Sequence, residues 1–172
     1  GYVHAQGVVH RDLKPSNIFL ERVSGEDVIR VMDFGIAKVL DSDLTLTTAP
    51  IGTLHYMSPE HLHSMKDVDH RTDLYALGVI LYELLSNEKP FAADSLFGLQ
   101  EQIVSGRSVP LSARVDASQV LCDAVQRAMA LRREDRFESA AEFAAALQGP
   151  ATPAIPASPE PTERVPEPDG LQ

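Results

Sequence analysis

Four polar side chains near the start of the chain have the types and spacing that chemistry on a charged group requires. Asp12, Lys14 and Asn17 lie in the segment VVHRDLKPSNIFL, residues 8–20, and Asp33 follows thirteen residues after its end. A carboxylate can accept a proton, and an ammonium can offset negative charge as it develops. Amide and carboxylate oxygens are the ligands that hard divalent cations prefer.

The same residues also have simpler structural interpretations. Asp12 and Lys14 could form a surface ion pair, and Asn17 could be a turn residue. Asp33 and Gly35 could belong to a type I turn. The apolar residues on both sides of the charged group argue against an ordinary solvated loop, and the charges argue against a core segment. Both interpretations remain open on these residues alone.

The surrounding pattern indicates which elements would position these side chains. Residues 2–6 are typical of a helix end, with Gly7 as its stop. Short extended segments are predicted at residues 8–10, 18–20 and 28–32, with the turn SGED between the last two. Such strands would bring Asn17 and Asp33 to the same end.

Four helices are predicted after a long irregular stretch over residues 33–60. Residues 73–86 are apolar nearly all round, which is typical of a helix in the centre of a domain. The more amphipathic segments are 96–104, 118–131 and 139–147. The last one begins with Ser139 and Glu142 at the spacing of a capping box. Short strands followed by helices indicate an α+β fold that is mostly α.

Composition excludes several classes of protein. A hydrophobic fraction of 44% supports a folded core, and a net charge of −10 disfavours nucleic acid as a partner. The single Cys122 excludes an internal disulfide framework and fits a reducing, cytoplasmic compartment. The longest apolar run, residues 74–82, is far shorter than the ~20 residues of a membrane span.

Other polar groups do not suggest a second chemistry. His61, His63 and His70 lie close together in the sequence, but their spacing matches no zinc-binding pattern. Residues 149–172 contain seven of the twelve prolines and no apolar periodicity, so we expect a disordered tail or linker there. The folded domain is expected over residues 1–148.

Five sequence blocks, taken in order, resemble the catalytic lobe of a bacterial-type serine/threonine protein kinase. The blocks are HRDLKPSN (10–17), DFG (33–35), GTLHYMSPE (52–60), DLYALGVILYELL (73–85) and EDRFESAAEF (134–143). This signature describes enzymes that transfer a phosphoryl group from ATP to a protein hydroxyl. The resemblance implies a kinase C-terminal lobe with short strands around the catalytic loop and helices packed round a central one.

The resemblance implies a role for each chemical residue. Asp12 would accept or orient the substrate hydroxyl, and Lys14 would offset charge on the transferred phosphate. Thr53 would bond both of them, as it does in serine/threonine kinases. Asn17 and Asp33 would hold Mg²⁺, or Mn²⁺, on the ATP phosphates.

The resemblance also implies residues that bind the adenine ring and residues that support the site. Phe19 would lie under the adenine, with Ile80 and Leu84 behind it. Asp73 would brace the backbone of the catalytic loop, a role that does not exclude a cap on its own helix. The remaining matched positions are structural in the family: His10, Arg11, Phe34, Gly35, Glu60 and Arg136, with Glu60 and Arg136 as an ion pair.

Regulation and substrate choice are suggested by single residues. Arg11 precedes Asp12 and could pair with a phosphate on Thr45, Thr47 or Thr48, which would order the activation segment. Ser16 stands where many arginine-directed relatives have an acid. Glu83 remains as an acid near that pocket.

The N-terminal lobe, which precedes the catalytic lobe in a kinase, has no counterpart in the sequence. No glycine-rich GxGxxG loop occurs, and the chain starts with glycine rather than methionine. We therefore expect a piece of a longer kinase that lacks its N-terminal lobe and shows little activity alone. The parent would bind protein substrates and ATP, with a membrane anchor beyond the tail. The alternative is a non-catalytic lobe that binds a partner or competes for substrates.

Overall fold

The computed structural model describes residues 1–34, 51–64 and 68–149. Gly35, Thr45, Thr47, Thr48 and the tail after Gly149 lie outside the described residues. The elements are, in chain order, α1 (Tyr2–Ala5), η1 (Pro15–Asn17), β1 (Ile18–Val23), β2 (Glu26–Val31), α3 (Ile51–Leu54), α4 (Pro59–His63), α5 (Arg71–Ser86), α6 (Leu96–Ser105), η3 (Leu111–Ala113), α7 (Gln119–Ala128), η4 (Arg133–Asp135) and α8 (Ala140–Gln148). The predicted α+β fold, mostly α, is confirmed.

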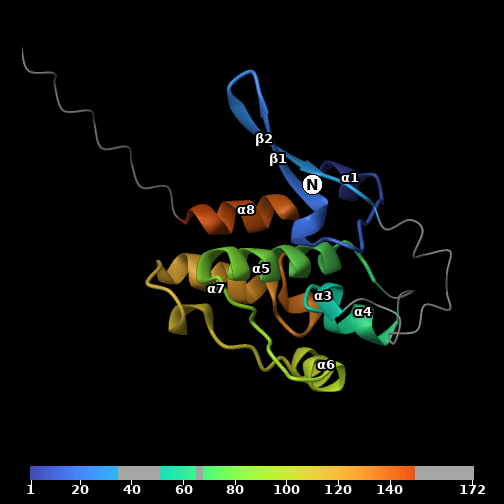
Figure 1. Ribbon diagram of the computed structural model, residues 1–172. Helices are drawn as coiled ribbons and strands as arrows, with labels where there is room; N and C mark the ends of the chain where they lie inside the picture. The colour runs from blue at the N-terminus through green and yellow to red at the C-terminus, as the bar shows by residue number, and fades with distance from the viewer. Residues whose placement is uncertain (35–50, 65–67, 150–172) are drawn as a thin grey trace, which may run out of the picture.

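The two strands form an antiparallel hairpin that projects from the helical body (Figure 1). Ser24 and Gly25 form its two-residue turn, and both have positive φ angles of 53° and 91°. Such a turn matches the right-handed twist of the flanking strands. The predicted turn is therefore confirmed at Ser24 and Gly25, whereas Glu26 and Asp27 belong to β2, and the extended segment at residues 8–10 pairs with no described strand.

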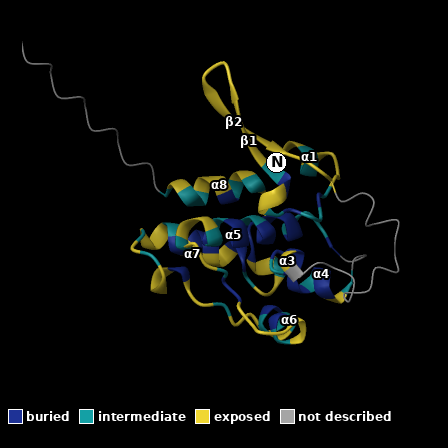
Figure 2. Cartoon of the chain, viewed as in Figure 1, coloured by how far each residue is buried: buried dark blue, intermediate teal, exposed yellow. Residues whose placement is uncertain are grey.

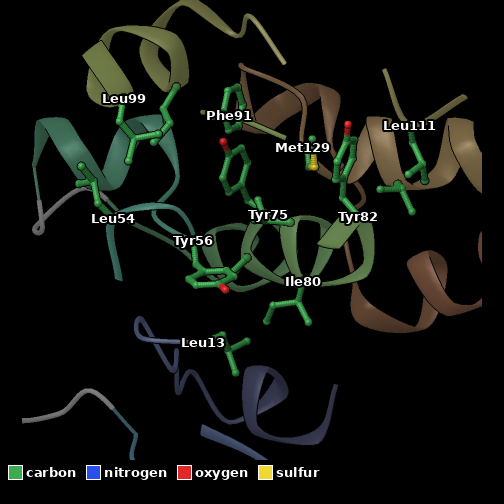
Figure 3. Close-up of a cluster of buried hydrophobic side chains, with 14 of the residues drawn as sticks. Leu13, Leu54, Tyr56, Tyr75, Ile80, Tyr82, Phe91, Leu99, Leu111 and Met129 are labelled. Carbon is green, nitrogen blue, oxygen red and sulfur yellow. The ribbon is translucent and has the colours of Figure 1, made fainter. Parts of the chain in front are cut away.

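The central helix α5 is buried among the other helices (Figure 2). Its first three turns are almost entirely inaccessible, and the side chains of Tyr75, Ile80 and Tyr82 project from it into the main core (Figure 3). Helices α5, α7 and α8 lie side by side, and α6 packs beyond α3 and α4 (Figure 1). The predicted central position is confirmed, except at the last turn, where Leu84 is 73% exposed.

Three helices begin at serine caps. The Oγ atoms of Ser95, Ser118 and Ser139 accept hydrogen bonds from backbone N–H groups of α6, α7 and α8, which would otherwise have no partner. At α8, Ser139 accepts from Glu142 N at 3.1 Å, as the capping box predicts. The Glu142 carboxylate, however, accepts from Glu138 N at 2.8 Å, one residue before the expected donor.

The stretch predicted to be irregular over residues 33–60 contains two short helices, α3 and the start of α4, so that prediction was wrong there. Both are too short to show an apolar period. They are held by tertiary contacts: Leu54 and Leu62 are buried in the main core, and Ser58 Oγ lies 2.6 Å from Thr72 Oγ1 on α5. Packing, not helix propensity, stabilises such single turns.

Helices α5 and α7 pack closely at Gly78. A Cβ atom at this position would lie 2.9 Å from Ala128 Cβ and 2.9 Å from Met129 Cγ. We therefore expect Gly78→Ala to lower the free energy of unfolding by about 1–3 kcal/mol, because Ala128 cannot rotate away. Urea denaturation followed by circular dichroism would measure the change.

A matched glycine provides the control for this prediction. Gly52 lies in α3, and among the described residues nothing stands within 4 Å of its Cβ position. Gly52→Ala should leave stability unchanged or slightly raised, since alanine favours helix by up to about 1 kcal/mol. Equal stability of the two variants would contradict the close packing at Gly78.

Candidate active site

Lys14 joins the two other polar residues at the centre of the site, Asp12 and Thr53. Its Nζ atom donates to Asp12 Oδ2 at 3.0 Å and to Thr53 Oγ1 at 3.4 Å. Thr53 is 39 residues away in the sequence and is buried in α3. Asp12, Lys14 and Thr53 therefore form one constellation, rather than the surface ion pair that the sequence alone left open.

Asp73 fixes the backbone that carries Asp12. Its carboxylate, on α5, is almost fully buried and accepts from His10 N at 2.8 Å and Arg11 N at 2.9 Å. Arg11 has a φ of 64°, in the left-handed region that costs a non-glycine residue about 1 kcal/mol or more. His70 is the residue at the N-cap of α5, and Asp73 braces the loop instead of capping the helix.

His10 connects the same loop to the segment of Asp33. Its Nε2 lies 2.8 Å from Met32 O, and its Nδ1 accepts from Asp12 N at 3.3 Å. With Nδ1 as an acceptor, Nε2 is the ring nitrogen that donates to Met32 O. The rings of His10 and Phe34 are in contact, with centroids 4.8 Å apart, so two of the positions expected to be structural lie together.

Asn17 is the second link to Asp33. The amide Nδ2 of Asn17 donates to Asp12 O at 2.9 Å, and Asn17 O accepts from Met32 N at 2.9 Å. Met32 immediately precedes Asp33, which is exposed and has a φ of 55°. The backbone bond thus brings the two predicted metal ligands to the same end of the hairpin.

The donor set at this position suits a hard divalent cation. With Nδ2 used as a donor to the loop, Asn17 presents its oxygen Oδ1, which accepts a long 3.5 Å bond from Ser16 Oγ. Asp33 adds a charged oxygen ligand. Elsewhere in the described residues, no group of three or more His, Cys, Asp or Glu side chains could hold a metal, the three clustered histidines included.

The predicted adenine contacts divide into exposed and buried residues. Phe19 on β1 is 52% exposed, so its ring is accessible to a planar ligand. Ile80 is buried in the core near Leu13, whereas Leu84 is largely exposed at the end of α5 (Figure 3). Of the two supporting residues, only Ile80 is held in place by the described part of the chain.

Glu60 and Arg136 form a buried ion pair between α4 and the segment before α8. Arg136 Nη1 and Nη2 donate to the two carboxylate oxygens of Glu60 at 2.7 and 2.8 Å, and the guanidinium also bonds the carbonyls of Ala130, Arg71 and Leu131. Burial alone would raise the pKa of Glu60, but the bonds from Arg136 outweigh it and lower that pKa.

Sequence reasoning missed two groups of residues near the site. His4 Nε2 lies 2.8 Å from Asp73 Oδ2, as a third partner of the bracing carboxylate. Lys89 forms an ion pair with Glu83, and Tyr56 joins both. No sequence pattern indicates either contact, because the partners are brought together only by the fold.

Comparison with known proteins shows the family to which the chain belongs. The protein kinase domain family matches residues 1–143, and the chain therefore belongs to this family. The chain is 41% identical over 150 residues to the serine/threonine-protein kinase PknB of Mycobacterium tuberculosis (85% of this chain, 23% of the relative). It is 45% identical over 152 residues to the serine/threonine-protein kinase Pkn1 of Myxococcus xanthus (84% and 21%).

A third relative, a probable serine/threonine-protein kinase PknB of Bifidobacterium longum, is 40% identical over 146 residues, with 83% of this chain and 21% of the relative covered. The chain thus spans about a fifth of the length of these curated relatives. In the described residues no helix is long and apolar enough to cross a bilayer.

The Glu60–Arg136 pair predicts an acid-sensitive contribution to stability. The folded pKa of Glu60 is below its ordinary value of 4.5, so the unfolded chain binds more protons in acid. The pair's contribution is fully present above that value and is lost as the pH falls through the lower folded pKa. Urea unfolding at a series of acidic pH values should show this loss.

Two variants test the assignment. Glu60→Gln should cost about 3–5 kcal/mol at neutral pH, since it leaves a fully buried guanidinium without its counter-charge, and should flatten the acid dependence. The double variant Glu60→Gln, Arg136→Met should cost less than the single one. An acid dependence that is unchanged in Glu60→Gln would assign the pH effect to another carboxylate.

Proposed function

We propose that this site transfers the γ-phosphate of ATP to serine or threonine hydroxyls of protein substrates. The observation that carries the proposal is the position of Lys14 Nζ, within bonding distance of both Asp12 and Thr53. Phosphoryl transfer needs alignment, cationic charge and a proton acceptor rather than a covalent intermediate. The Asp12 carboxylate and the Lys14 ammonium, which also donates to the buried Thr53, supply the last two.

Each residue has a defined part in this mechanism. Asp12 orients the acceptor hydroxyl and takes its proton, while Lys14 offsets the charge of the phosphate in transfer. Thr53 holds the ammonium in place from α3. Asn17 and Asp33 are the residues that would hold Mg²⁺ on the ATP phosphates, where the cation supplies charge neutralisation. The exposed ring of Phe19 would lie against the adenine.

The domain boundaries belong to the same proposal. We propose that residues 1–148 form the folded catalytic lobe and that residues 149–172 act as a linker. Support comes from the last helix, which ends at Gln148 and is followed by Gly149 with a φ of 69°. The coherent placement of four chemical side chains favours transfer over a purely binding role, because a binding lobe has no need of their geometry.

The first test is loss of the proposed base. Asp12→Asn should lower phosphate transfer by roughly 10²–10⁴-fold, because the hydroxyl loses its proton acceptor. The assay should use the product as its source makes it, captured with an antibody against residues 91–107, with labelled ATP, Mg²⁺ and a serine/threonine peptide mixture. Sequence reasoning predicts little transfer by the 172-residue chain alone.

The control replaces a carboxylate outside the site. Asp27 lies on β2, far along the hairpin, in a long 3.9 Å contact with Arg22. Asp27→Asn removes the same charge and should leave transfer unchanged. Transfer that survives Asp12→Asn, or that is absent from the native product, would overturn the proposed function.

Regulation by phosphorylation is a second prediction of this proposal. Arg11 makes no ion pair among the described residues, and its backbone is fixed beside Asp12 by Asp73. A phosphate on Thr45, Thr47 or Thr48 would supply the missing anion and order the activation segment. Mass spectrometry of active native product should find phosphate on at least one of the three. Full activity with all three unmodified would contradict it.

A further inference from the structure

Three side chains form a compact polar cluster at the end of α5, which we call the Lys89 cluster: Tyr56, Glu83 and Lys89. Lys89 Nζ lies 2.6 Å from Glu83 Oε2, and Tyr56 Oη donates to the same oxygen at 2.6 Å. Lys89 Nζ also bonds Tyr56 Oη and stands 4.4 Å from the centre of its ring. Each member thus contacts the other two, which fixes all three.

The backbone explains why Lys89 returns to α5. Asn87 ends the helix with a left-handed φ of 55°, and its N–H bonds Glu83 O at 2.8 Å. The chain therefore reverses direction within two residues, and Pro90 prevents the helix from continuing. Lys89 is carried back over the side chain that lies six residues before it.

The Lys89 cluster borders the proposed acceptor site, which is the place beside Asp12 where the substrate hydroxyl would bind. Tyr56 N donates to Thr53 O at 3.2 Å, so the tyrosine lies one turn after the threonine that contacts Lys14. Asp12, Thr53 and Tyr56 line one small cavity of about 10 Å³, which is too small for a peptide but shows that the three residues are neighbours. A peptide whose hydroxyl reaches Asp12 would therefore pass close to Tyr56 and to the groups bonded to it.

The charge of Glu83 decides which substrate side chains the Lys89 cluster attracts. Glu83 and Lys89 are 29% and 28% exposed, so both are within reach of a bound peptide. The bonds from Lys89 and Tyr56 lower the pKa of Glu83 against the effect of burial, so its carboxylate is ionised at neutral pH. Without Lys89, an ionised carboxylate would stand at the border and attract arginine or lysine.

We propose, on the basis of the proposed function, that Lys89 neutralises Glu83 and so makes the acceptor site indifferent to basic residues in its substrates. The substrate class is then a serine or threonine peptide with no arginine requirement. Sequence reasoning left Glu83 as an acid for arginine, but the structure pairs it internally. Ser16, a neutral residue near Asp12, adds no opposing charge to this border. Lys89 is a specificity-determining residue and takes no part in the reaction itself.

Peptide binding tests this inference without any phosphate transfer. The probes are two fluorescein-labelled peptides with one serine each, identical except that one carries arginines before the serine and the other carries glutamines. Fluorescence anisotropy with the 172-residue chain should give equal affinities. Lys89→Met should bind the arginine peptide about twofold to fivefold tighter than the glutamine peptide, as expected for one exposed ion pair.

Three control variants separate charge from structure. Lys89→Arg keeps the positive charge and should restore equal affinities. Glu83→Gln in the Lys89→Met background should abolish the preference for arginine. Arg107→Met removes the same charge from an exposed pair with Glu101 on α6 and should leave both affinities unchanged. Added salt should reduce the preference created by Lys89→Met, because the ion pair is partly exposed.

A spectroscopic measurement checks that the Lys89 cluster exists in solution. Burial lowers the pKa of His55, and the charge of Lys89 lowers it further. NMR titration of the imidazole should therefore show a higher His55 pKa in Lys89→Met than in the unchanged chain. The same spectra show whether the variant is folded.

The outcomes distinguish this inference from the proposed function. A preference of the unchanged chain for the arginine peptide would overturn the inference, and so would equal affinities in folded Lys89→Met or no binding to any variant. If the selectivity changes as expected while the native product transfers no phosphate, the inference about Lys89 holds and the proposed function fails.

Discussion

The rest of the site depends on the hydrogen bonds that the buried carboxylate of Asp73 accepts from the backbone of the loop before Asp12. A carboxylate at 1% exposure must be compensated by hydrogen bonds, because an unpaired buried charge is costly. Its partners are two backbone N–H groups of the catalytic loop and the ring of His4. These bonds hold Arg11 in its strained conformation and thereby direct the following residue, Asp12, toward Lys14 and Thr53.

The central helix carries this constraint to both ends of the site. Asp73 lies in its first turn and Glu83 in its last, so one rigid element positions the catalytic loop and the border of the acceptor site. Close packing at Gly78 fixes α5 against α7, and the Glu60–Arg136 pair fixes the segment of Thr53 and Tyr56 against the C-terminal helices. The close packing of the first three turns of α5 keeps the helix from shifting, so the residues that it carries stay in fixed positions relative to one another.

The site contains two lysine–carboxylate ion pairs, and they differ in their surroundings. Lys14 is paired with Asp12 at the reacting position, where the proposed chemistry uses both charges. Lys89 is paired with Glu83 at the position where a substrate side chain would pass. Under the two proposals, the same kind of ion pair has a chemical use in one place and cancels a charge in the other. The difference lies in what can approach each pair from solvent.

The sequence by itself determined the α+β class, the start of the hairpin turn, the four long helices and the blocks that indicate the kinase family, since these depend on local period and on blocks of fixed spacing. Only the tertiary structure decided the short helices around Thr53 and the contacts of His4 and Lys89. His4 and Asp73 are 69 residues apart, and no local preference encodes such a contact. Lys89 and Glu83 are near in sequence, but whether they meet depends on the left-handed end of α5. Which charged side chains meet depends on which of them are buried together and on where the chain reverses direction. Both are properties of the folded chain.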